Sequence, residues 1–182
     1  MASYTARELA NAFRTVRRNT IQIAEDIPEA KYDFVPAPGT KSVSELLRHI
    51  AFAPMVQLEM HREQRVSTLA GFDFQALIAR VGAAERQPRG KTEIVELLHG
   101  EGERFASWLE SLDDGFLNET FTDPTGQHPK TRLEALMGAK EHEMHHRGQL
   151  MLMERLVGVV PHLTRQREER ARGRQSAASG VS

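Results

Sequence analysis

The sequence predicts an all-α protein built as a four-helix bundle. Apolar residues recur every three or four positions in four long stretches, strand-like alternation is scarce, and the 182 residues include no cysteine that could form a disulfide framework. A domain of about this size buries roughly 70% of its unfolded-chain surface, so packed helix faces suffice to fold it. We expect one bundle domain over residues 1–163 and a mobile basic tail over residues 164–182.

Periodicity and capping patterns predict where the four long helices lie. Their expected ranges are residues 5–25, 42–62, 92–112 and 131–156. The second helix begins with the capping-box pair Ser42 and Glu45, and the fourth begins with Thr131 and Glu134 at the same spacing. Pro54 lies inside the second helix and should kink it, because proline lacks the backbone donor that a helix interior needs.

The connections are expected to hold smaller elements. Residues 65–90 should form a loose connection with a short helix at 74–85. Residues 116–122 could form a short strand of a hairpin, since the sequence Asp-Pro-Thr-Gly at 123–126 favours a turn. From Arg165 onward the chain has almost no apolar residue, which predicts a solvated, mobile extension.

Composition excludes several classes of protein. Lys and Arg (24) nearly balance Asp and Glu (25), giving a formal charge of −1, so nucleic acid is not an expected partner. The absence of cysteine excludes Cys-ligated zinc, iron–sulfur clusters and a catalytic thiol within the chain. No window approaches the roughly 18 apolar residues of a membrane span, and the N-terminus lacks a secretory apolar stretch. We expect a cytoplasmic protein without a membrane partner.

Three histidines are expected to face the bundle interior. His142 and His146 are one turn apart on a stripe of small and apolar residues in the fourth helix, and His49 lies on a similar stripe in the second. Three buried imidazoles are hard to satisfy by hydrogen bonds alone, whereas a metal ion takes one nitrogen from each. His145 lies on a neighbouring row. The alternative is a set of separately satisfied core histidines, or a partly exposed pair.

Residues 142–146 also match the H-E-x-x-H pattern of zincin proteases, with Glu143 as the general base. The residues after His146 lack the continuation that metzincins require. Glu168 and Glu169, the remaining carboxylates for a gluzincin arrangement, lie in the expected tail. A zincin-like protease is therefore the less favoured hypothesis.

Two stretches of the sequence together resemble the DinB/YfiT-like metalloprotein family. They are Ser42-Val43-Ser44-Glu45-Leu46-Leu47-Arg48-His49-Ile50 and Glu141-His142-Glu143-Met144-His145-His146-Arg147-Gly148-Gln149-Leu150. The resemblance implies a four-helix bundle with up-down-down-up connections and a metal held by His49, His142 and His146. The family includes thiol-dependent transferases and isomerases that use bacillithiol or mycothiol, together with members of unassigned activity. It also implies a small-molecule substrate and a homodimer.

The expected cofactor is one divalent ion. Zinc or nickel is favoured because imidazole suits both, with iron or manganese as alternatives. Any thiol nucleophile must be a low-molecular-weight cosubstrate, because the chain has no cysteine. The candidate groups for proton transfer or ligand orientation are Glu45, Glu143, His145 and Gln149. The resulting hypothesis is a metal-dependent enzyme, either a thiol-dependent S-transferase or isomerase, or a hydrolase. The alternative is a non-catalytic metal-binding or stress-associated bundle.

Overall fold

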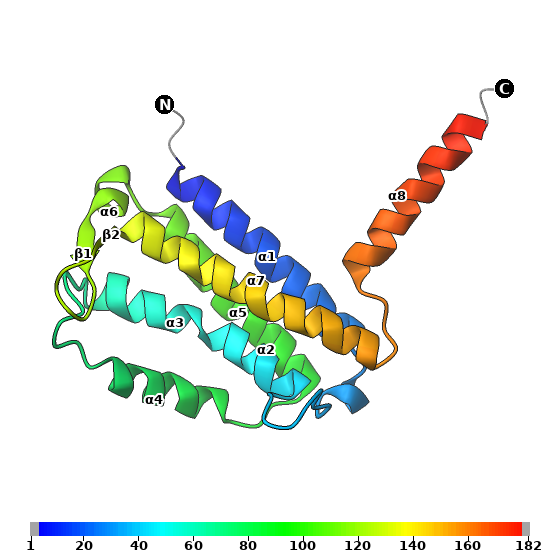
Figure 1. Cartoon of the computed structure of the whole chain (residues 1–182), viewed down its shortest axis with the longest axis horizontal. Helices are drawn as coiled ribbons and strands as arrows, with labels where there is room; N and C mark the ends of the chain where they lie inside the picture. Colours follow the sequence, from blue (N-terminus) through cyan, green and yellow to red (C-terminus); the bar gives the residue numbers. More distant parts are fainter. Residues whose placement is uncertain (1–3, 180–182) are drawn as a thin grey trace.

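Four long helical segments lie side by side in the computed structural model, which describes residues 4–179 (Figure 1). Residues 1–3 of the expected bundle domain and 180–182 of the expected tail lie outside the described residues. The segments are α1 (Ala6–Asp26), α2 (Val43–Phe52) with its continuation α3 (Pro54–Gln57), α5 (Lys91–Glu110) and α7 (Arg132–Leu156). The α2–α3 segment and α5 run opposite to α1 and α7, which is the up-down-down-up arrangement (Figure 1).

Two of the long helices begin at the capping residues that the sequence predicted, Ser42 and Thr131, and α1 begins at a third cap, Thr5. The Thr5 hydroxyl accepts a hydrogen bond from the backbone N–H of Glu8 at the start of α1. Ser42 and Glu45 form the predicted capping box of α2, and Thr131 caps α7. These side chains satisfy backbone donors that would otherwise lack partners in the first turn.

The second helix is interrupted where Pro54 was expected to kink it. Helix α2 ends at Phe52 and α3 begins at Pro54, followed by one stretch of π-helix, η2 (Leu58–Glu63). Proline is tolerated at the first position of a helix because the N–H it lacks would be unpaired there. The break sets the direction of α3, which forms one wall of the cavity described below.

Apolar side chains fill the bundle along its whole length. At one end Phe13 of α1 and Phe105 of α5 meet edge to face, with ring centroids 4.9 Å apart. At the other end Leu47, Ile94 and Leu150 join α2, α5 and α7. Burial of these faces is the main stabilising contribution to the fold.

The short elements sit at the ends and on one side of the bundle (Figure 1). Helix α4 (Phe74–Glu85) covers α2 and α3, and a single 3-10 turn, η1 (Glu29–Lys31), follows α1. Strands β1 (Thr120–Thr122) and β2 (Pro129–Thr131) form the expected antiparallel hairpin. The strand is shorter than the predicted 116–122 because the side chain of Asp113 caps another helix, α6 (Asp114–Asn118).

Beyond the bundle the chain continues as helix α8 (His162–Ser179), which projects away from the other helices (Figure 1). The segment predicted as a tail therefore has regular helical structure. Its base is attached to α1, since Arg165 forms an ion pair with Asp26 (2.7 Å) and His162 Nε2 lies 3.3 Å from Asn19 Oδ1. Within residues 4–179, none of the helices is both long and apolar enough to span a membrane.

Candidate metal centre

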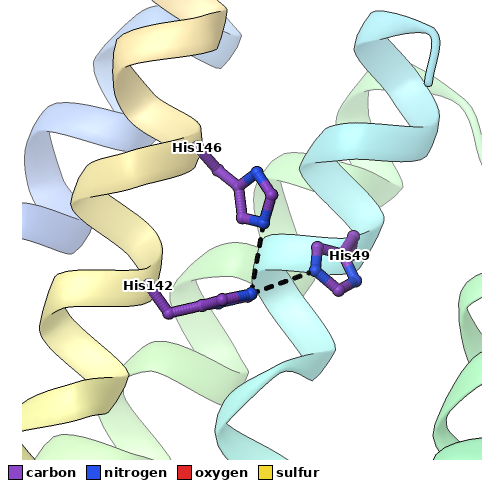
Figure 2. A group of neighbouring side chains, drawn as sticks. All are labelled: His49, His142 and His146. Carbon is purple, nitrogen blue, oxygen red and sulfur yellow. Dashed lines mark hydrogen bonds between the residues drawn. The ribbon is translucent and has the colours of Figure 1, made fainter. Parts of the chain in front are cut away.

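Helices α2 and α7 bring three histidine rings to one point (Figure 2). His142 Nε2 lies 3.2 Å from His49 Nε2 and 3.1 Å from His146 Nε2. The three potential ligand atoms all lie within 4.8 Å of one another. The sequence-predicted trio is thus assembled from two helices that are distant in sequence.

The spacing of these nitrogens suits a common metal ligand shell. A tetrahedral zinc ion bonded to imidazole at about 2.0–2.1 Å separates neighbouring ligand nitrogens by roughly 3.3 Å. The separations of 3.1 and 3.2 Å are close to that value. The donor set, three imidazole nitrogens, suits zinc, copper, iron or nickel. His49, His142 and His146 could therefore hold one divalent ion.

Hydrogen bonds behind two of the rings orient their Nε2 lone pairs toward the centre. His49 Nδ1 lies 2.9 Å from a carboxylate oxygen of Glu85, and His146 Nδ1 lies 2.8 Å from Gln149 Oε1. Both oxygens are acceptors, so each Nδ1 carries the proton and donates it. The Nε2 atoms are left deprotonated, as metal ligation requires.

Glu85 was not among the site residues predicted from the sequence. It is the last residue of α4, and its backbone carbonyl accepts a hydrogen bond of 2.7 Å from Arg48 Nε, beside His49 in α2. The sequence did predict the helix at 74–85. No motif spacing links the end of that helix to His49, so only the packing of α4 on α2 shows the contact.

Burial keeps the rings of His142 and His146 neutral. Burial, together with the adjacent rings of His146 and His49, lowers the pKa of His142 to about 4. Burial also lowers the pKa of His146. For Glu85, burial acts to raise the pKa, but the hydrogen bond from His49 helps to bring it below its ordinary value. At neutral pH the His142 and His146 rings are therefore neutral near the ionised carboxylate of Glu85, the state that metal binding needs.

The buried face of α7 is displaced from the predicted stripe. It runs through Leu136, Glu143, Leu150 and Met153, while His142 and His146 border it and are half-buried. The large leucines occupy the centre of the bundle, where burial is most favourable, and leave the histidines at its edge.

Glu143 lies on this buried face and has a structural role instead of the catalytic one considered for it. Its carboxylate forms an ion pair with Arg17 in the core, with Arg17 Nε 2.9 Å from Oε1, and both side chains are buried. A zincin needs this glutamate beside the metal as general base. The structure therefore contradicts both the zincin arrangement and a proton-transfer role for Glu143.

The other candidate residues divide into one capping residue and two that adjoin the centre. Glu45 is exposed and accepts a hydrogen bond from the backbone N–H of Ser42, as the capping box requires. His145 is exposed, with its ring centroid 4.9 Å from that of His146. Gln149 contacts both rings, since its Nε2 lies 3.3 Å from His145 Nε2. Gln149 thus positions His146, and His145 lies just outside the trio.

Two open cavities adjoin the trio. The first has a volume of about 440 Å³ and is lined by His49, His142 and Glu85 together with apolar residues of α3, α4 and α7. The second, of about 500 Å³, is lined by His146 and Gln149 with apolar residues of α7 and the loop before α2. Both volumes fall in the range typical of small-molecule sites.

The family profile of the DinB superfamily matches residues 12–150, and the chain belongs to this superfamily. The uncharacterized protein YjoA of Bacillus subtilis (strain 168) is 25% identical over 158 residues, which cover 84% of this chain and 91% of YjoA. The crystal structure of YjoA matches with a TM-score of 0.61 at 24% identity, covering 83% of this chain and 92% of that one.

Two further solved structures share the fold. One is YfiT of Bacillus subtilis, described as a probable metal-dependent hydrolase with an unusual four-helix bundle topology (TM-score 0.63, 18% identity, 87% of this chain and 91% of YfiT). The other is a mycothiol-dependent maleylpyruvate isomerase (TM-score 0.62, 10% identity, 82% of this chain and 63% of the isomerase).

Proposed function

We propose that His49, His142 and His146 bind one divalent metal ion and that the protein is a metal-dependent enzyme acting on a small molecule. The observation that carries this proposal is the convergence of three Nε2 atoms, at 3.1 and 3.2 Å, with two of the rings oriented by Glu85 and Gln149. Purely structural histidines do not need their lone pairs aimed at one point.

Such an ion, held by neutral imidazoles, would supply uncompensated positive charge that favours the deprotonated form of a water or thiol at neutral pH. Glu85 keeps the His49 ring in place, and Gln149 does the same for His146. His145 is exposed beside His146, where it is placed to accept or release a proton. The two cavities give reactants access to the centre from either side.

We infer two reaction types for this centre. Hydrolysis needs only water, and the description of YfiT favours it. A thiol-dependent transfer or isomerisation needs a low-molecular-weight thiol as cosubstrate, because the chain contains no cysteine. The presence of a cavity on each side of the centre favours this second type, since it can admit two reactants.

Metal analysis of untagged protein tests the metal site. We expect one equivalent of zinc or nickel per chain, since affinity rises toward that end of the divalent series. His49→Ala, His142→Ala and His146→Ala should each abolish tight binding, whereas His145→Ala should retain it. An equal loss on replacing His145, or a wild-type protein that binds no metal, would overturn the assignment.

Cobalt substitution separates the two reaction types. If a thiol binds as cosubstrate, adding bacillithiol or mycothiol should change the absorption spectrum of the cobalt protein through a sulfur–metal bond. His142→Ala should eliminate that change. A spectrum that responds to none of the thiols tested would leave hydrolysis as the reaction type.

A further inference from the structure

Lys41 lies where the two cavities meet. It directly precedes Ser42, the capping residue of α2, and it is the one lysine or arginine among the described residues that line either cavity. The first cavity contains His49 and His142 on its wall and the second contains His146. A single exposed ammonium group therefore borders both approaches to the histidine trio.

The charge of Lys41 is available to a ligand. Within residues 4–179 it forms no ion pair with a carboxylate. Its positive charge nevertheless reaches both sides of the centre, because it lowers the pKa of Glu85 and of His146. These contributions are smaller than those of burial and of His49. A cation that lines a cavity and has no ion-pair partner attracts anions.

The first cavity has apolar walls that remain open to solvent. Phe74 and Ile78 of α4 are each 45% exposed although both are large hydrophobic residues, and Val81 continues the same face. Val56 and Ala139 face the cavity from α3 and α7. Open apolar surface of this kind, next to a few polar groups, is typical of a pocket that binds the apolar part of a small ligand.

We propose that Lys41 is a specificity-determining residue, and that the site takes an amphipathic substrate with an apolar body and a carboxylate. The apolar body lies in the first cavity against Phe74, Ile78 and Val81, and the Lys41 ammonium binds the carboxylate. The reactive group then lies beside the histidine trio. This last placement rests on the proposed function, whereas recognition of the apolar body and the carboxylate does not require a metal.

Calorimetric titration with two probes of equal length tests the charge recognition. Octanoate and octanamide are titrated into the full chain, as wild type and as Lys41→Met, with the metal content of each preparation measured. We expect Lys41→Met to weaken octanoate binding by about fivefold, the effect of losing one partly solvated ion pair, and to leave octanamide unchanged. Lys130→Met, at an exposed position in the hairpin, is the matched control and should change neither.

A second pair of variants tests which cavity is used. Ile78→Ser lies in the first cavity and should weaken both probes, whereas Leu152→Ser, in the second, should not. Octanoate affinity that is indifferent to Lys41→Met, or that falls with Leu152→Ser instead of Ile78→Ser, would overturn the proposal.

The same titration on His142→Ala separates this inference from the metal assignment. If the wild-type protein binds no metal but Lys41→Met still weakens octanoate binding in the His142→Ala background, the metal centre alone is refuted. Loss of the Lys41 effect in a protein that binds metal as expected would refute the substrate class alone.

Discussion

Arg17 holds both carboxylate oxygens of Glu143 in the interior of the bundle, with Nε 2.9 Å from Oε1 and Nη2 3.0 Å from Oε2. The same guanidinium donates to the backbone carbonyls of Ile50 (3.1 Å) and Leu98 (2.9 Å). Ile50 follows His49 in α2, and Glu143 follows His142 in α7. Arg17 therefore ties together the two helices that carry the histidines, directly behind the centre.

Gly102 leaves room for this arginine. A Cβ at that position would lie 2.7 Å from Arg17 Cγ, which is closer than real side chains approach. The ion pair thus depends on three helices. Helix α1 carries Arg17, α7 carries Glu143, and α5 has a glycine where a side chain would clash with Arg17.

Glu143→Gln should destabilise the fold strongly, because it leaves the Arg17 charge buried without its partner. Removing one member of a buried pair costs about 3–5 kcal/mol. Urea unfolding measures the change. Arg14→Met, which removes the half-exposed arginine that pairs with Glu103 and Glu110, is the control and should cost about 0–1 kcal/mol. Equal effects of the two substitutions would contradict the structural role of the buried pair.

Glu85→Gln should weaken metal binding without abolishing it. The amide loses the negative charge that supports the Nδ1 proton of His49, and such outer partners typically contribute 10–100-fold in metal affinity. A competition titration with a chromophoric chelator measures the loss. Glu96→Gln, an exposed glutamate of α5, should leave the affinity unchanged. If Glu85→Gln binds as tightly as wild type, Glu85 does not position the ligand.

Glu154 should make the fold less stable at alkaline pH. Its side chain is fully buried, neither carboxylate oxygen has a hydrogen-bond partner among the described residues, and burial, with the nearby charge of Asp26, raises its pKa to about 7. A carboxyl group with a raised pKa in the folded state stabilises the fold while protonated. That contribution is complete below the unfolded pKa of about 4.5 and is lost as the pH rises through 7.

Glu154→Gln should therefore be more stable than wild type at pH 8, by about 2–3 kcal/mol, with most of that difference gone at pH 5. Urea unfolding at both pH values gives the comparison, with Glu96→Gln as a control that should show no such pH dependence. A Glu154→Gln protein that gains nothing at pH 8 would show that the carboxylate finds a partner in solution.

We expect the protein to form a homodimer. Leu152, Leu156 and Val160 are 58%, 54% and 51% exposed near the end of α7, and exposed apolar side chains that gather in one region can mark a protein–protein contact. Light scattering should give twice the mass of one chain, and Leu156→Glu should reduce it to the mass of one chain while Ile78→Glu does not. A monomer mass across a wide concentration range would disprove the prediction.

Local sequence patterns were sufficient to determine the helices of this bundle. Capping boxes such as Ser42 with Glu45, the periodic apolar residues and Pro54 act within one or two helical turns, so they can be recognised without knowing the fold. The four-residue separation of His142 and His146 likewise places both rings on one side of α7 in any helix. Pairing them with His49 needed only the expectation that two inward stripes face each other.

The tertiary structure decided which side of α7 enters the core and what supports the histidines. Two adjacent stripes of α7 both carry small and apolar residues. The stripe that contains Glu143 is the buried one, because Arg17 on α1 neutralises the Glu143 carboxylate. Glu85 reached His49 because α4 packs on α2, a contact between residues 36 positions apart. Such relationships depend on long-range packing and on the pairing of buried charges, and no local pattern in the sequence encodes them.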